Sequence, residues 1–152
     1  MIDAKRNIGL ELKKKPDIAI FEGWCIGAKP QSNNSLIKPL NELERKKDKK
    51  LIWRRTVNNE LKNNYKKIFK MIDFLIFIKI PNFKYIYKWR SLQEKKLRKS
   101  SKGKKIMSNL NIKEFIMHYE RVTKYMLKTL NKTSNLLINL NKEHCFKSIK
   151  LN

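Results

Sequence analysis

The chain of 152 residues contains only four glycines, Gly9, Gly23, Gly27 and Gly103. None belongs to a Gly-x-x-x-x-Gly-Lys-Ser/Thr sequence, in which backbone amides and a lysine cradle nucleotide phosphates. Scattered surface lysines do not replace such a loop, because they are hydrated and unoriented. We therefore expect that this chain does not anchor a nucleoside triphosphate unaided.

Cysteines and long apolar runs are also scarce. Cys25 and Cys145 are far apart and have no Cys-x-x-Cys or histidine-spaced partner, so we expect neither a disulfide framework nor a zinc site. No uncharged apolar run reaches the roughly 18 residues that a membrane helix needs. Residues 1–12 mix charges into the place where a secretory signal is apolar. These absences predict a cytoplasmic protein with no membrane span.

Acidic residues number 13 against 37 basic ones, which gives a formal net charge of +24. Such a field attracts nucleic acids and other polyanions without specific contacts. However, 30 of the basic residues are lysine and 7 are arginine, the type that direct base reading favours. They are spread over every segment, as on an ordinary solvated surface. A basic nucleic-acid- or ribosome-binding module is therefore the alternative function.

The first half of the sequence predicts a strand, a loop and a long helix. Residues 18–21 are apolar and end at Glu22 and Gly23, which is typical of a buried strand followed by a turn. Residues 28–35 carry a proline, serines and asparagines and predict a loop. Apolar residues then recur every three or four positions and predict one helix face packed on a core: Trp53, Val57, Leu61, Tyr65, Ile68, Phe69 and Ile72.

The second half predicts an interior strand at 74–80, a helix from Asn82, a basic loop at 99–105, and a helix capped by Asn111 and Glu114. A last strand at 134–140 precedes a polar C-terminus. This alternation favours one α/β domain over residues 1–152, with a mostly parallel sheet flanked by helices.

Two groups of polar residues are candidates for chemistry at the edge of this sheet. Glu22 follows a predicted strand, and open α/β sheets bind ligands at the carboxyl ends of their strands. An exposed glutamate in a turn is the alternative. Arg90 shares a helix face with Gln93 and Glu94, with Arg98 and the loop lysines beyond it. An ordinary Arg90–Glu94 ion pair, contributing a few tenths of a kcal/mol, competes with a functional role for Arg90.

The last predicted helix adds His118 and Arg121. His118 lies at the edge of the apolar stripe, which predicts a partly buried, hydrogen-bonded histidine rather than a general base. Arg121 points nearly opposite the stripe, so it faces either water or a partner, and we expect water.

Five motifs stand in a characteristic order: EGWCIGAKP at 22–30, LNELE at 40–44, WRRTVNNEL at 53–61, YKWRSLQE at 87–94 and FIMHYERVT at 115–123. Together they resemble the D-glycerate 3-kinase family of P-loop kinases over about residues 17–140. The resemblance implies transfer of the ATP γ-phosphate to a hydroxyl of D-glycerate, with Mg²⁺ bridging the phosphates, on a three-layer fold.

The resemblance also implies roles for residues that match its motifs. Glu22 corresponds to the catalytic, magnesium-side acid, holding Mg²⁺ directly or through water, and Arg90 to a catalytic lid residue. Gln93, Glu94 and Arg98 accompany Arg90 in the lid, and His118 and Arg121 support the site. We add Lys29 as a candidate ligand for the substrate carboxylate, because an anion beside this loop favours a cation.

Members of this family carry an upstream segment with the phosphate-binding loop, whose strand lies between the counterparts of 18–21 and 74–80. Without that strand, buried backbone groups at the gap cost about 1–3 kcal/mol each. We therefore expect an incomplete P-loop kinase-like fold, active only with a separate chain that supplies the loop. The alternatives are strands that close up in a new order, or a partly disordered remnant without function.

Overall fold

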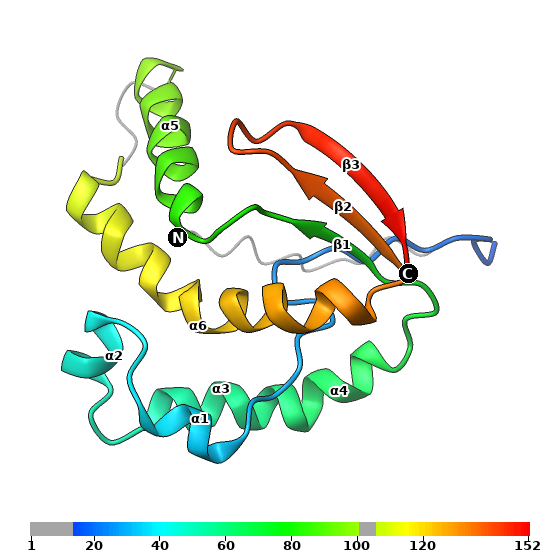
Figure 1. Cartoon of the computed structure of the whole chain (residues 1–152), viewed down its shortest axis with the longest axis horizontal. Helices are drawn as coiled ribbons and strands as arrows, with labels where there is room; N and C mark the ends of the chain where they lie inside the picture. Colours follow the sequence, from blue (N-terminus) through cyan, green and yellow to red (C-terminus); the bar gives the residue numbers. More distant parts are fainter. Residues whose placement is uncertain (1–13, 101–105) are drawn as a thin grey trace.

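The computed structural model describes residues 14–100 and 106–152, so the basic loop predicted at 99–105 lies largely outside it (Figure 1). Among the described residues, no helix is both long and apolar enough to cross a membrane. The helices and strands, in chain order, are α1 (Asn33–Ile37), α2 (Glu42–Lys47), α3 (Ile52–Lys62), α4 (Asn64–Phe69), β1 (Ile76–Lys79), α5 (Lys84–Ser100), α6 (Asn109–Thr133), β2 (Leu136–Leu140) and β3 (Phe146–Leu151).

The sheet is small and mixed, with the strand order β1-β2-β3. β1 pairs with β2 in parallel, as predicted, and β2 pairs with β3 antiparallel. β3 corrects the expectation of a polar C-terminus and of a mostly parallel sheet. Its hairpin forms because the Asn141 side chain accepts hydrogen bonds from the backbone N–H groups of Glu143 and Cys145.

The core lies where α6 packs between the sheet and the α3–α4 pair (Figure 1). Leu61 of α3, Met126 and Leu130 of α6 and Ala28 are buried there, and partly buried side chains of α4 and β1 pack around them. Helix α6 supplies the central layer, so residues on its different faces meet different neighbours.

Residues 18–21 do not form the predicted strand. Ile18 is 80% exposed and Ile20 is 90% exposed, and no described strand pairs with this segment. The apolar pattern alone was insufficient, because a strand requires a neighbouring backbone to satisfy its N–H and C=O groups. For the same reason β1, predicted as an interior strand, is an edge strand within the described part of the chain.

The predicted long helix is broken at Asn63, whose φ and ψ of −109° and −82° are not helical. The buried face of α3 is also rotated from the predicted stripe. Arg54, Asn58 and Leu61 are buried, whereas Val57 is 48% exposed. The rotation has a polar cause, because Arg54 donates to the carbonyl of Leu36 in α1 and Asn58 donates to the carbonyl of Gln31.

Helix α6 begins before the predicted cap. The Ser108 hydroxyl accepts a hydrogen bond from the backbone N–H of Asn111 and is the N-cap, so Asn111 lies inside the helix. Helix α5 follows Asn82 as predicted.

Candidate functional site

Two pockets open on different faces of α6. The first, the α3–α6 pocket, has a volume of about 210 Å³ and lies between α3, α6 and the loop at 29–31. The second, the β1–α6 pocket, has a volume of about 390 Å³ and lies between β1, α5 and α6. Four of the predicted site residues line one pocket or the other: Lys29, His118 and Arg121 the first, and Arg90 the second.

Lys29, His118 and Arg121 line the α3–α6 pocket. Lys29 is exposed. His118 is also exposed, which corrects its predicted partial burial, and its ring meets Trp53 edge-on at 5.1 Å between centroids.

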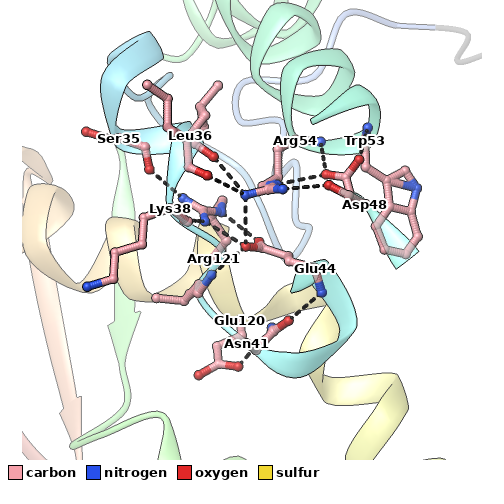
Figure 2. Close-up of polar contacts among 12 residues, drawn as sticks. Ser35, Leu36, Lys38, Asn41, Glu44, Asp48, Trp53, Arg54, Glu120 and Arg121 are labelled. Carbon is pink, nitrogen blue, oxygen red and sulfur yellow. Dashed lines mark hydrogen bonds and ion pairs between the residues drawn. The ribbon is translucent and has the colours of Figure 1, made fainter. Parts of the chain in front are cut away.

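Arg121 does not face water, as predicted from its position opposite the apolar stripe, but forms a buried ion pair (Figure 2). Its guanidinium donates to both carboxylate oxygens of Glu44, from Nε at 2.7 Å and from Nη2 at 2.6 Å. It also donates to the carbonyls of Ser35 and Lys38. The prediction failed because α2 and the segment after α1 cover this face of α6.

A second buried arginine completes the network shown in Figure 2. Arg54 donates through Nε to Asp48 at 2.8 Å and through Nη1 to the carbonyl of Leu36. The Asp48 carboxylate also accepts the backbone N–H groups of Trp53 and Arg54, in the first turn of α3. Since Leu51 offers no side-chain cap, Asp48 satisfies these helix donors.

Both carboxyls of this network are ionised at neutral pH. Burial alone raises the pKa of Glu44, but the bonds from Arg121 and from the Leu40 N–H outweigh it and hold that pKa below its usual range. Burial likewise opposes ionisation of Asp48, and the bonds from Arg54 and the Trp53 N–H lower its pKa. The arginines are therefore bound to carboxylates and carbonyls and act as scaffold.

The β1–α6 pocket is lined mainly by apolar side chains, and Arg90 is the one charged residue among those described around it. Its guanidinium donates to Gln93 at 2.7 Å and pairs with Glu94, whose side chain is 6% exposed. It also lies 5.4 Å from the centre of the Phe115 ring. Within the described residues the Nε of Arg90 is buried and has no hydrogen-bond partner.

Trp24 closes another side of this pocket. Its indole N–H donates to the Thr123 hydroxyl at 3.0 Å, and its ring meets Tyr119 edge-on. The turn that places it contains Gly27 at a φ of +76°, where a Cβ would lie 2.7 Å from a Leu75 methyl. Only glycine fits this approach without strain.

Glu22 and Arg98 line neither pocket. Glu22 is exposed in the extended segment before Trp24, and Arg98 is exposed near the end of α5. The structure thus brings Arg90, Gln93 and Glu94 together, groups Lys29 with His118 and Arg121, and separates the two sets by α6.

Sequence patterns did not single out Asp48, Arg54 and Asn58 as site residues. Asn58 exchanges hydrogen bonds with the backbone N–H and C=O of Gln31 and so fixes the loop that bears Lys29. The available signal was the spacing of Arg54, Asn58 and Leu61, which share one helical face. The motif residues Glu44, Arg54, Asn58 and Arg121 therefore hold the scaffold together.

The described residues do not fit a complete site for ATP or magnesium. They contain no group of three or more His, Cys, Asp or Glu side chains able to hold a metal ion. Glu22 offers a single carboxylate, and the phosphates of ATP find no amide cradle in this sequence.

Comparison with known proteins identifies relatives of one kind. An "Uncharacterized kinase mug58" of Schizosaccharomyces pombe is 31% identical over 137 residues, which cover 90% of this chain and 46% of that protein. The chloroplastic D-glycerate 3-kinase of Arabidopsis thaliana is 29% identical over 120 residues, 79% of this chain and 24% of the enzyme. No family model matches.

The fold resembles about half of a solved D-glycerate 3-kinase from Cryptococcus neoformans. The two structures agree with a TM-score of 0.70 at 23% identity, over 94% of this chain and 52% of the kinase. The resemblance predicted from motif order is confirmed: the chain is glycerate-kinase-like over most of its length. It spans about half or less of each relative.

Proposed function

We propose that this protein is the lid-bearing part of a phosphotransferase that moves the γ-phosphate of ATP to a hydroxyl of D-glycerate. The phosphate-binding loop comes from a separate polypeptide. The observation that carries the proposal is the likeness to D-glycerate 3-kinase in both sequence and fold. The absence of a Gly-x-x-x-x-Gly-Lys-Ser/Thr sequence supports the need for a second polypeptide.

The β1–α6 pocket is the better place for the reacting groups. Ile80, just beyond the carboxyl end of β1, lines it, and parallel α/β sheets bind ligands at that edge. Arg90 faces the pocket, and Gln93 and Glu94 hold its guanidinium in place. An arginine fixed in this way suits a phosphoryl group whose negative charge must be stabilised.

Lys29 serves a different purpose in this proposal. It lies at the α3–α6 pocket, on another face of α6 from Arg90, so the two cations do not contact one small substrate in this arrangement. We therefore assign the α3–α6 pocket and its buried ion pairs to support of the fold. Lys29 can bind the carboxylate of a substrate held by Arg90 only if the loop at 29–31 moves.

The test is reconstitution. We expect the purified chain alone not to retain ATP in equilibrium dialysis with magnesium. We expect D-glycerate-dependent ADP release when it is combined with the part of the Cryptococcus neoformans kinase that it does not match. In that pair, Arg90→Gln should lower kcat/KM by about 10²-fold or more, whereas Lys128→Gln on the exposed side of α6 should not. Tight ATP binding by the chain alone, or an inactive pair, contradicts the proposal.

A further inference from the structure

One face of the sheet is apolar and uncovered. In-register residues on neighbouring strands point to the same side, so the pairs Ile76–Leu136, Ile78–Ile138, Leu136–Leu151, Ile138–Ile149 and Leu140–Phe146 mark one common face. We call this the outer sheet face. Its members are Ile76, Ile78, Leu136, Ile138, Leu140, Phe146, Ile149 and Leu151.

The exposures on this face are large for apolar side chains. Ile76 is 51% exposed, Ile78 57%, Ile149 58%, Phe146 64% and Leu151 71%. Helices α1–α4 and α6 lie to one side of the sheet in Figure 1. The residues that alternate with the outer-face ones, Phe77 and Leu137, are the ones that pack on the core or are buried. Contiguous exposed apolar patches of this kind mark interaction surfaces in soluble proteins.

The sequences of β1 and β2 are those of strands covered on both faces. Residues 74–78 read FLIFI and residues 136–140 read LLINL, nearly continuous apolar runs instead of alternating ones. Such runs are typical of parallel strands that have helices on both sides. The inward-facing residues of these two strands are covered, since Leu137 is 4% exposed and Phe77 packs on the core. Among the described residues, no helix covers the side chains of the outer sheet face.

We propose that the outer sheet face binds an acidic polypeptide through the apolar side of an amphipathic helix, and that this polypeptide supplies the part of the kinase that the chain does not match. This inference rests on the proposed function and names its partner surface. The solved kinase shares the fold and contains as much chain again, which must pack against surfaces that this half leaves open. A helix is the usual cover for a parallel sheet.

Charge selects the acidic partner over a second copy of this chain. Each copy carries a net charge of +24, and Lys142, Lys147 and Lys150 are exposed on or beside β3. Two such faces repel one another, whereas carboxylates flanking an apolar stripe are attracted.

Binding is measured by sedimentation velocity and titration calorimetry at physiological salt. The probes are the unmatched parts of the Cryptococcus neoformans and Schizosaccharomyces pombe kinases, each produced as a separate polypeptide. The test variant is Ile76→Glu/Ile149→Glu, at positions that are more than half exposed and that do not line the β1–α6 pocket. The matched control is Ile52→Glu/Leu110→Glu, which adds the same charge at positions 65% and 74% exposed outside the sheet. Circular dichroism verifies that both variants fold like the parent chain.

We expect a one-to-one complex whose dissociation constant rises at least about tenfold in the test variant and stays nearly unchanged in the control. Equal weakening in both variants, or no complex with either probe, overturns the inference. A homodimer that Ile76→Glu/Ile149→Glu dissociates also overturns it, in favour of a second copy. A face-dependent complex without D-glycerate-dependent ADP release keeps the docking surface and refutes the proposed function instead.

Discussion

At the scale of single residues, the most constrained group is the Glu44 carboxylate. Its side chain is 7% exposed, and it receives the fork of Arg121, with an Arg54 nitrogen 3.9 Å away. A buried ion pair is not in itself strongly stabilising, because both charges lose their hydration. Removing one partner is costly, since the other charge is left buried and unpaired.

Arg121→Met tests this scaffold role. The substitution keeps much of the apolar stem but removes the bidentate pairing, so we expect the free energy of unfolding at pH 7 to fall by about 3 kcal/mol. Lys46→Met is the control, because the Lys46–Glu42 pair is on the surface, with side-chain exposures of 69% and 54%. It should leave the urea unfolding midpoint nearly unchanged. Similar midpoints for the parent chain and Arg121→Met would show that the pair is dispensable.

The pH dependence of the same variant gives a second readout. In the parent chain the pKa of Glu44 is lowered, so its contribution to stability is present above the ordinary carboxyl pKa of about 4 and is lost as pH falls through the lower, folded value. In Arg121→Met, burial without the arginine raises that pKa, and protonation on acidification then favours the folded state. The stability gap between the two chains should therefore narrow from pH 7 to pH 3. A constant gap would indicate that Arg121 acts through packing alone.

Spacing along the sequence located some of these side chains and not others. The Arg90–Glu94 pair is visible at a separation of four, because that spacing places both on one helical face. The partners of Arg121 were not predictable, since Glu44 lies 77 positions away and its approach depends on how α2 packs on α6. Periodicity gives the direction of a side chain but not the element that it meets.

At the scale of elements, the start of α6 can be tested by comparing its observed N-cap, Ser108, with the predicted cap, Asn111. Ser108→Ala removes the hydroxyl that accepts the Asn111 N–H, so we expect it to lower the free energy of unfolding by about 1 kcal/mol. Asn111→Ala should be neutral or slightly stabilising, because Asn111 is an exposed position inside the helix. Thermal unfolding of both variants decides the matter. The reverse order of effects would restore Asn111 as the cap.

The elements that the sequence predicted well are those that find at least one pairing or packing partner within the described residues. Helices α5 and α6 and strands β1 and β2 follow their apolar patterns closely. The segment 18–21 has the composition of a strand but no described partner to bond with, so it stays extended and exposed. Strand β3 was missed because an irregularity in its pairing with β2 at Asn139/Leu140 places Phe146 and Ile149 three residues apart on one face.

At the scale of the whole molecule, the sheet is covered on one side and the surface carries a large positive charge. The first feature matches a protein that spans 52% of a kinase with the same fold. The charge has a simpler account, because lysines occur on nearly every element instead of gathering in one stripe. The uncovered sheet predicts apolar docking of a polypeptide, whereas the charge predicts nonspecific binding of polyanions. The dependence of affinity on salt concentration distinguishes the two.

A fluorescence titration with single-stranded and duplex RNA tests the rival function of a basic binding module. We expect weak binding that does not depend on base sequence and that falls steeply between low and physiological salt, because lysine contacts to phosphates release counterions. Duplexes of equal length and different sequence are the matched comparison. Binding by the partner polypeptide to the outer sheet face should lose much less over the same salt range, since burial of apolar surface is not screened. Sequence-selective RNA binding that persists at physiological salt would instead favour a nucleic-acid function over the kinase-like one.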